Sequence, residues 1–310
     1  MSKELDIYLA EPRGFCAGVV RAVNIVEETL KEFGAPIYVR HEIVHNKHVI
    51  ADLKNKGVIF VNEIDEVEDT NRPVIFSAHG TGLDIAAKAK ELNLKTIDAV
   101  CPLVKRVHNQ IRKLNEIGAE IIIIGKKNHP EIIGTIGQLP KGKSFYIIDS
   151  IEQLQSLPIN PDSIVGFVTQ TTLSADDTKE IIEHLRAKFK NLHSLAGNDI
   201  CYATTNRQKA VKELAKYVEL IVILGSQNSS NSKQLKEVAL KSGVKDAILI
   251  DDVSELDWSK VKSFSKIGIS AGASAPEHLT QELLNQFATH YDKINIHECI
   301  ICKEEINFKG

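Results

Sequence analysis

Residues 11–23 read Glu11-Pro-Arg-Gly-Phe-Cys16-Ala-Gly-Val-Val-Arg-Ala-Val23, which places one cysteine between a short strand and a helix. The apolar residues 7–10 predict the strand, and Pro12 and Gly14 predict the turn after it. Apolar residues at positions 19, 23, 26 and 30 predict one face of the helix. Cys16 is therefore expected at the positive end of a helix, where unpaired N–H groups favour the thiolate that binds metal or attacks electrophiles.

Two further cysteines occupy the same kind of position. Cys101-Pro-Leu-Val opens a second predicted helix, with Pro102 in the first turn, and Cys201-Tyr-Ala-Thr-Thr-Asn opens a third. A single buried cysteine is ordinarily a small core residue, and three inert core cysteines in a duplicated fold remain an alternative. Because all three fall at the same step of a recurring pattern, we expect them to share a function.

The composition is that of an ordinary globular protein. The chain has 310 residues, of which 43% are apolar and 25% charged, enough for two or three domains of about 100–150 residues. A net charge of −3 gives no electrostatic reason to expect nucleic acid or a membrane as a partner. No apolar leader and no run of about 18 apolar residues is present, so we predict a cytoplasmic protein. In that compartment five cysteines are more typical of metal ligands or redox groups than of disulfides.

Strand-like runs alternate with helical patterns along the whole chain, which predicts an α/β fold with parallel sheets. The runs form three sets: 7–10, 37–40, 58–61 and 74–77; 96–99, 121–124, 145–148 and 164–168; and 221–224, 247–250 and 267–270, with 192–195 or 198–200 as a weak opener. We predict three similar parallel-sheet α/β units, 1–98, 99–198 and 199–310, the last including a C-terminal tail. Facing each other about a pseudo-threefold axis, they would enclose a central site.

The spacing of polar loops supports the repeat. His45 lies 29 residues after Cys16, His129 lies 28 after Cys101, and Ser229 lies 28 after Cys201. A further polar loop follows the last strand of each set, at residues 77–82, 169–172 and 270–275. These loops are expected at the carboxyl ends of parallel strands, where α/β proteins bind ligands.

Three thiolates from three units, none in a C-x-x-C pair, suit an iron–sulfur cubane with one iron open to substrate, since an electron carrier would use four. Hydrogen-bond donors outnumber acceptors in the surrounding loops, which predicts an anionic ligand such as a phosphate or diphosphate. The candidate donors are His45, His79, His129, Thr171, Ser229, Ser230, Asn231 and Ser274. Each histidine could instead be a surface or core residue.

One carboxylate belongs to these loops. Glu131 follows His129 by two residues, and burial beside an anion would raise its pKa and make it a candidate proton donor. The alternative is an exposed glutamate in the first turn of a helix after Pro130.

Together these motifs resemble the 4-hydroxy-3-methylbut-2-enyl diphosphate reductase family, over about residues 5–280. The residues that carry the resemblance are Pro12-Arg-Gly-Phe-Cys16-Ala-Gly-Val, Tyr38-Val-Arg-His-Glu-Ile-Val-His45-Asn, Phe76-Ser-Ala-His79-Gly, Asp98-Ala-Val-Cys101-Pro-Leu-Val, His129-Pro-Glu131, Thr169-Gln-Thr-Thr-Leu-Ser, Asp199-Ile-Cys201-Tyr-Ala-Thr-Thr-Asn-Arg-Gln, Gly225-Ser-Gln-Asn-Ser-Ser-Asn231-Ser and Ala271-Gly-Ala-Ser274-Ala-Pro.

The resemblance implies a cloverleaf of three α/β units and the last step of the methylerythritol phosphate route to isoprenoids. That step is a two-electron, two-proton reductive dehydroxylation that yields isopentenyl and dimethylallyl diphosphates plus water. The resemblance further implies a four-iron four-sulfur cluster on Cys16, Cys101 and Cys201, with the open iron taking the substrate hydroxyl. Glu131 would deliver protons and Thr171 would relay them or orient the hydroxyl. The diphosphate would be held by His45, His79, His129, Ser229, Ser230, Asn231 and Ser274. By the same analogy, flavodoxin or ferredoxin would supply the electrons.

Two other patterns stand apart from this family. Residues 137–144 match the P-loop, but a helix-like stretch precedes them and a strand-like stretch follows, which is the reverse of a P-loop's context. The tail His297-Glu-Cys299-Ile-Ile-Cys302 carries a lone C-x-x-C pair, and 294–301 is expected as a sheet-edge strand. Besides the reductase, two hypotheses stay open: a P-loop nucleotide enzyme, and a non-catalytic sensor of a phosphorylated metabolite that holds a cluster or zinc.

Overall fold

The computed structural model describes residues 4–194 and 199–308, which contain three all-parallel sheets. The first sheet has the order β3-β2-β4-β5 and the second has the order β7-β6-β8-β9. The third has five strands in the order β11-β10-β12-β1-β13. Helices connect the strands throughout, as parallel pairing requires. The prediction of three α/β units with parallel sheets is thus confirmed, and their arrangement about a threefold axis stays a prediction.

The strands and helices have the following bounds. The first sheet contains β2 (Ile37–Arg40), β3 (Val58–Val61), β4 (Val74–Phe76) and β5 (Thr96–Asp98), and along the same stretch run α1 (Ala17–Phe33), α2 (Lys47–Asn55), η1 (Ile64–Glu66) and α3 (Leu83–Glu91). The second contains β6 (Glu120–Ile124), β7 (Phe145–Ile148), β8 (Ile164–Thr169) and β9 (Asn191–His193), with α4 (Pro102–Glu116), α5 (Pro130–Ile136), α6 (Ile151–Gln155) and α7 (Ala175–Lys188). The third contains β1 (Glu4–Glu11), β10 (Leu220–Leu224), β11 (Asp246–Ile250), β12 (Lys266–Ala271) and β13 (Lys293–Ile300), with α8 (Tyr202–Leu214), α9 (Ser230–Lys241), η2 (Val253–Glu255), α10 (Trp258–Val261) and α11 (Glu277–His290).

The chain divides into two compact units. The single-sheet unit comprises the described parts of Met1–Val19, His45–Val49 and Tyr202–Asn307, and it contains the third sheet. The two-sheet unit comprises Val20–Val44 and Ile50–Cys201 and contains the other two sheets. The boundaries 98/99 and 198/199 predicted from sequence stay predictions.

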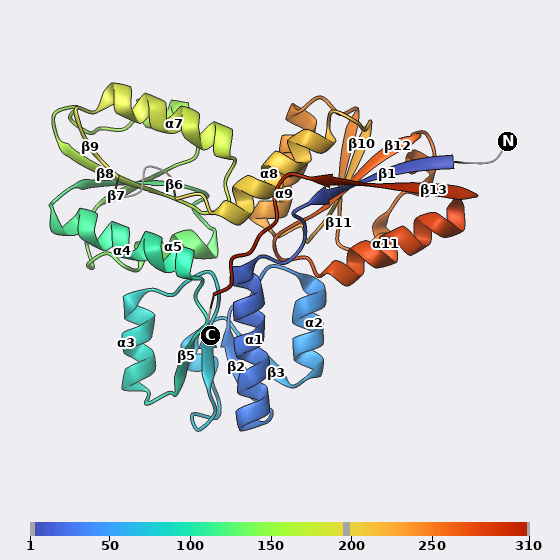
Figure 1. Cartoon of the computed structure of the whole chain (residues 1–310). Coiled ribbons are helices and arrows are strands. Elements are labelled where there is room, and N and C mark those ends of the chain that lie inside the picture. Colours follow the sequence, from blue (N-terminus) through green and yellow to red (C-terminus); the bar gives the residue numbers. More distant parts are fainter. Residues whose placement is uncertain (1–3, 195–198, 309–310) are drawn as a thin grey trace. The chain divides into compact units, whose positions relative to one another are not determined.

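The strand at the chain's beginning was assigned to the wrong sheet from sequence. β1 lies between β12 and β13, with Ile7 opposite both Ile267 and Ile296, so it belongs to the third sheet (Figure 1). The other two openers are displaced in the same way, because β5 pairs with β4 and β9 with β8. β5 and β9, which we expected to open the second and third sets, are therefore edge strands of the first and second sheets, and β1 is an inner strand of the third. The reason is that the helix after each cysteine carries the chain out of one sheet and toward the next, which local periodicity does not reveal.

The sheets are covered on both faces, which explains their uninterrupted apolar strands. In β6, Ile121 and Ile123 pack with residues of α4 such as Ile111, while Ile122 and Ile124 pack on the opposite side with residues of α7 such as Leu185. All four isoleucines have no exposed surface. Such burial fixes where the strands end and hence where the polar loops begin.

The tail forms the strand expected at a sheet edge. β13 is the edge strand of the third sheet, next to β1, and the partly buried Cys299 packs against the apolar core that contains Ala10 and Val211. None of the helices in the described ranges 4–194 and 199–308 has the length and apolar character that crossing a membrane requires.

The placement of β1 can be tested by truncating a buried side chain. Ile7 is fully buried between two strands, so Ile7→Ala should lower the free energy of unfolding by about 2–5 kcal/mol. Amide hydrogen exchange should rise in β12 and β13. Ile59→Ala is the control, since Ile59 on β3 is 42% exposed and should cost far less. Faster exchange confined to β2–β4 would contradict this topology.

Candidate functional site

Each of the three predicted cysteines donates a backbone hydrogen bond of the same kind. The amide of Cys101 donates to Ala78 O at 3.1 Å, that of Cys201 to Thr171 O at 3.0 Å, and that of Cys16 to Ala273 O at 3.1 Å. The three acceptors lie in the loops that follow β4, β8 and β12. The helices begin directly after the cysteines, at Ala17, Pro102 and Tyr202, as the sequence predicted.

The predicted site residues are divided between the two units. Cys16, His45, Ser229, Ser230, Asn231 and Ser274 lie in the single-sheet unit, and His79, Cys101, His129, Glu131, Thr171 and Cys201 lie in the two-sheet unit. Among the described residues, no group of three or more His, Cys, Asp and Glu side chains forms a metal site. The convergence of three thiols therefore stays a prediction. In kind, the residues fit an iron–sulfur cluster, because each cysteine is partly buried at the start of a helix.

In the two-sheet unit, Thr171 joins the Cys201 backbone to Glu131. Thr171 N donates to Glu131 Oε1 at 2.7 Å, and Thr171 Oγ1 donates to Glu131 Oε2 at 2.8 Å. Glu131 is only 2% exposed and Thr171 is 5% exposed. The alternative of an exposed glutamate at the start of a helix is thereby excluded.

Glu131 is held in a state suited to proton transfer. Burial raises the pKa of Glu131 to about 7, against the opposing effect of the two hydrogen bonds from Thr171 and with a further increase from the nearby charge of Asp199. A carboxyl group with a pKa near 7 can give and regain a proton at physiological pH. Its chemistry is that of a general acid.

Two of the predicted histidines lie beside this carboxyl. His129 is the N-cap of α5, and its Nδ1 accepts a hydrogen bond from Glu131 N at 3.2 Å. The His79 ring lies edge-on to the His129 ring, with 6.0 Å between centroids. The two loops from which they come, after β4 and after β6, therefore meet within this unit.

Sequence reasoning missed a second buried carboxyl here. Asp199 is 4% exposed, and its Oδ2 accepts a hydrogen bond from Thr169 N at 3.2 Å. Burial raises the pKa of Asp199. A signal was present in the sequence, because Asp199 precedes Cys201 by two residues much as Asp98 precedes Cys101 by three.

In the single-sheet unit, the start of α9 gathers the predicted polar side chains. Ser229 is the N-cap and its Oγ accepts from Ser232 N at 3.3 Å. Asn231 is 4% exposed, and neither polar atom of its side-chain amide has a hydrogen-bond partner among the described residues. A buried amide without a partner is costly, which indicates that a ligand completes its hydrogen bonds.

Ser232 was not predicted as a site residue, although Gly225 and Gly272 in the neighbouring loops were a signal for it. It is fully buried, and a Cβ at Gly225 or Gly272 would lie 2.2 or 2.1 Å from its hydroxyl. Only glycine at these positions lets the two loops close around the start of α9.

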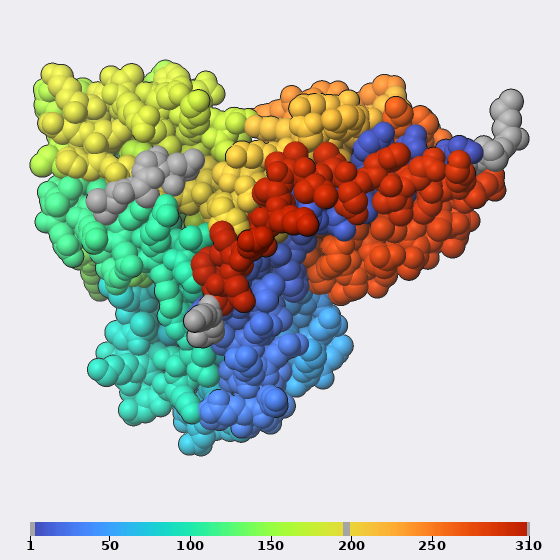
Figure 2. Space-filling view, in the orientation of Figure 1, coloured from blue at the N-terminus to red at the C-terminus, as the bar shows by residue number. Residues whose placement is uncertain are grey.

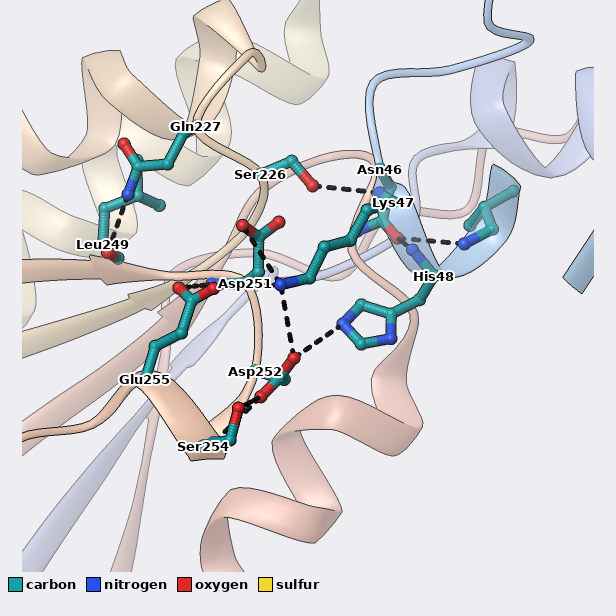
Figure 3. Close-up of polar contacts among 11 residues, drawn as sticks. Asn46, Lys47, His48, Ser226, Gln227, Leu249, Asp251, Asp252, Ser254 and Glu255 are labelled. Carbon is teal, nitrogen blue, oxygen red and sulfur yellow. Dashed lines mark hydrogen bonds and ion pairs between the residues drawn. The ribbon is translucent and has the colours of Figure 1, made fainter. Parts of the chain in front are cut away.

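His45 lies in the same unit, and polar contacts hold the residues that directly follow it (Figure 3). Ser274 Oγ donates to His45 O at 2.9 Å, and Ser226 Oγ accepts from Lys47 N at 3.1 Å. Figure 3 shows the Lys47 side chain reaching three carboxylates, at 2.9 Å for Glu255, 3.4 Å for Asp252 and 3.5 Å for Asp251.

This arrangement keeps Lys47 charged. Burial alone would lower the pKa of Lys47, but the hydrogen bond to Glu255 and the attraction of the other two carboxylates outweigh it and raise the pKa. His48 Nε2 adds a contact of 3.3 Å to Asp252. We refer to Lys47 with Asp251, Asp252 and Glu255 as the lysine clasp, which anchors the segment that carries His45.

The P-loop-like residues do not form a P-loop. They follow helix α5 and lead into strand β7, and Lys143 Nζ donates to Ala119 O at 3.0 Å. This confirms the reversed context predicted from the sequence, and the Lys143 ammonium already binds a backbone carbonyl. This removes the support for a P-loop nucleotide enzyme.

Comparisons with known proteins agree with one another along the whole chain. The profile of a family described as LytB protein matches residues 7–288. A Methylocella silvestris protein named 4-hydroxy-3-methylbut-2-enyl diphosphate reductase is 47% identical over 98% of this chain and 95% of its own length. A Rhizobium meliloti protein of the same name is 50% identical over 93% of this chain and 83% of its own. The solved structure of the E-1-hydroxy-2-methyl-but-2-enyl-4-diphosphate reductase from Plasmodium falciparum superposes with a TM-score of 0.92 at 37% identity, covering 100% of this chain and 96% of that one.

The raised pKa of Glu131 predicts a pH-dependent cost to stability. Below about pH 4.5 this carboxyl is neutral in both folded and unfolded chains. As pH rises from about 4.5 to 7, the unfolded chain ionises first, so the folded state loses stability, by about 3 kcal/mol in total. Glu131→Gln removes this loss, so its free energy of unfolding relative to wild type should increase across that range and level off above it.

The control for this experiment is Glu152→Gln. Glu152 occupies the first turn of α6 but is exposed, and a hydrogen bond from its own backbone lowers its pKa. Chemical denaturation at a series of pH values measures both variants. A flat difference between Glu131→Gln and wild type would show that the carboxyl is not buried as described.

The lysine clasp predicts a local effect at residues 45–49. Lys47→Met should speed amide exchange there about two- to fivefold, the range expected for losing about 0.4–1 kcal/mol of a partly exposed ion-pair network. Lys47→Arg should restore wild-type exchange. Lys245→Met is the control, because Lys245 pairs with Glu219 at the surface, away from this segment. Equal effects of Lys47→Met and Lys245→Met would refute an anchoring role.

Proposed function

The chain belongs to the LytB protein family, and on this premise we propose that it is a 4-hydroxy-3-methylbut-2-enyl diphosphate reductase. It reduces its substrate with two electrons and two protons, releases the hydroxyl group as water, and forms isopentenyl and dimethylallyl diphosphates. This is the final step of the methylerythritol phosphate route. Similarity over nearly the full length of relatives bearing this name favours the enzyme over a non-catalytic sensor.

The observation that carries the chemistry is the buried Glu131–Thr171 pair. With Oε1 fixed by Thr171 N, a proton taken up by Glu131 would reside on Oε2, and the hydrogen bond that Thr171 Oγ1 donates to Oε2 would then reverse. The hydroxyl can then receive that proton and pass its own to a substrate hydroxyl, which makes water the leaving group. Thr171 is in this way the relay and Glu131 the acid.

The family implies an iron–sulfur cluster. We assign to it the four-iron four-sulfur type, held by Cys16, Cys101 and Cys201 with one iron open to the substrate hydroxyl. When bound, the cluster supplies the two electrons and a Lewis acid. The chain itself places each of the three thiols at the start of a helix, where the cysteine amide donates a hydrogen bond to a loop carbonyl.

The substrate's diphosphate is assigned to the donors of the polar loops, which are His45, His79, His129, Ser229, Ser230, Asn231 and Ser274. Asn231 gives the strongest support, since its buried amide lacks partners at the start of the twelve-residue helix α9. The N-terminal N–H groups of that helix favour an anion in the same place.

The electrons come from outside the chain in this proposal. The pair Gly80 and Gly82 does not continue into the dinucleotide fingerprint, because Ile85 occupies the position of the third glycine. Flavodoxin or ferredoxin is the proposed donor, in the cytoplasm.

Replacing the acid tests the mechanism directly. Glu131→Gln should lower kcat about 10²- to 10⁴-fold under anaerobic conditions, while the binding of substrate changes little. Glu152→Gln is the matched control and should keep full activity. Undiminished turnover of Glu131→Gln would contradict the assigned role.

Replacing the cysteines tests the cluster. Iron and sulfide content, with the visible spectrum, should fall in each of Cys16→Ser, Cys101→Ser and Cys201→Ser after anaerobic purification. Cys299→Ser and Cys302→Ser serve as controls that keep the wild-type content. A full complement of iron in any of the first three variants would remove that cysteine from the ligand set.

A further inference from the structure

Arg207 on α8 is a buried charge that the proposed reaction does not use. Its side chain is 1% exposed and is the largest among the fully buried residues described. A guanidinium carries five N–H donors and cannot lose its charge, so burial without partners would be very costly. The groups that satisfy it therefore reveal what it holds in place.

Its partners come from two distant parts of the chain. Nε and Nη2 donate to Gly14 O at 3.1 and 2.8 Å. Nη1 donates to both carboxylate oxygens of Glu304 at 3.1 Å, and to Ala203 O at 2.9 Å. Asn206 Nδ2 donates to Glu304 Oε1 at 3.1 Å, so Glu304 is itself held by α8.

Gly14 belongs to the turn that presents Cys16. Its φ of +66° lies in the left-handed region, and a Cβ there would lie 3.1 Å from Ala275 O. Gly14 N donates to Ala271 O at 3.1 Å, and Cys16 N donates to Ala273 O at the same distance. Backbone bonds thus fasten the turn to the loop after β12, and Arg207 fastens its Gly14 carbonyl.

Glu304 lies in the tail beyond β13, where Figure 2 shows the red end of the chain on the surface. We propose that residues 301–307 form a strap in which Glu304 neutralises Arg207, and that this buried pair positions the turn before Cys16. Arg207 and Glu304 are positioning residues in this view. The consequence for cluster retention rests on the proposed function, but the effect on the turn does not.

The direction of the effect follows from the charge. Removing Glu304 leaves a buried guanidinium without its counter-charge, which favours opening of the site to water. Gly14 O then loses its fixed donor, and the segment around Cys16 opens more often. Replacing Arg207 itself would be hard to interpret, because it removes the contacts to both Gly14 and Glu304 and can unfold the unit.

The experiment measures the rate at which Cys16 is alkylated in the metal-free protein. Glu304→Ala should raise the rate of Cys16 alkylation by iodoacetamide about tenfold, equivalent to about 1.4 kcal/mol, with a smaller rise for Glu304→Gln. Peptide mass spectrometry separates the cysteines, and Cys101 in the other unit is the internal reference. Glu305→Ala is the control, since Glu305 is exposed and adjacent.

Unchanged Cys16 alkylation in Glu304→Ala, or equal acceleration in Glu305→Ala, would overturn the strap. Cluster retention is read separately, as the rate of iron loss to a chelator from the reconstituted protein, and it should rise in Glu304→Ala alone. Faster alkylation with unchanged iron loss would support the strap while counting against Cys16 as a ligand, so the two proposals fail in distinguishable ways.

Discussion

A single backbone hydrogen bond, repeated three times, sets the geometry on which the rest of this protein depends. In each case a cysteine amide reaches the carbonyl at the end of a neighbouring parallel strand, at 3.0 or 3.1 Å. This bond ends one strand and starts the next helix at a fixed point. Because that helix leaves for another sheet, the cysteine always marks the exit from a sheet at its ligand-binding edge.

Several polar groups are buried near this edge, where they lower the stability of the folded protein but can serve its function. Glu131 and Asp199 are both buried carboxyls with raised pKa values, and the Asn231 side-chain amide has no hydrogen-bond partner in the described part of the chain. Such groups lower stability and persist at sites where a ligand or a proton compensates for them. These groups fall into two sets, the two carboxyls in the two-sheet unit and the Asn231 amide at the start of α9 in the single-sheet unit.

Other buried or clustered charges serve position and not chemistry. Lys47 is surrounded by three carboxylates that hold the His45 segment, and Arg207 is neutralised by Glu304 while it grips Gly14. In both cases the charged pair lies beside a predicted site residue without being part of it. The Lys47 network is partly exposed, so its loss costs little, whereas removing one partner of Arg207, whose side chain is buried, is severe.

The sequence by itself determined the α/β class, the presence of three parallel-sheet units, the helix starts at the cysteines and the candidate acid Glu131. These follow from local features, namely the continuous apolar runs of strands buried on both faces and the recurring spacing of polar loops. Only the tertiary structure decided that β1 joins β12 and β13, that Asp199 and Ser232 are buried, and that the tail reaches Arg207. Strand partners and the burial of polar groups depend on contacts between residues far apart in the chain, and periodicity carries no information about them.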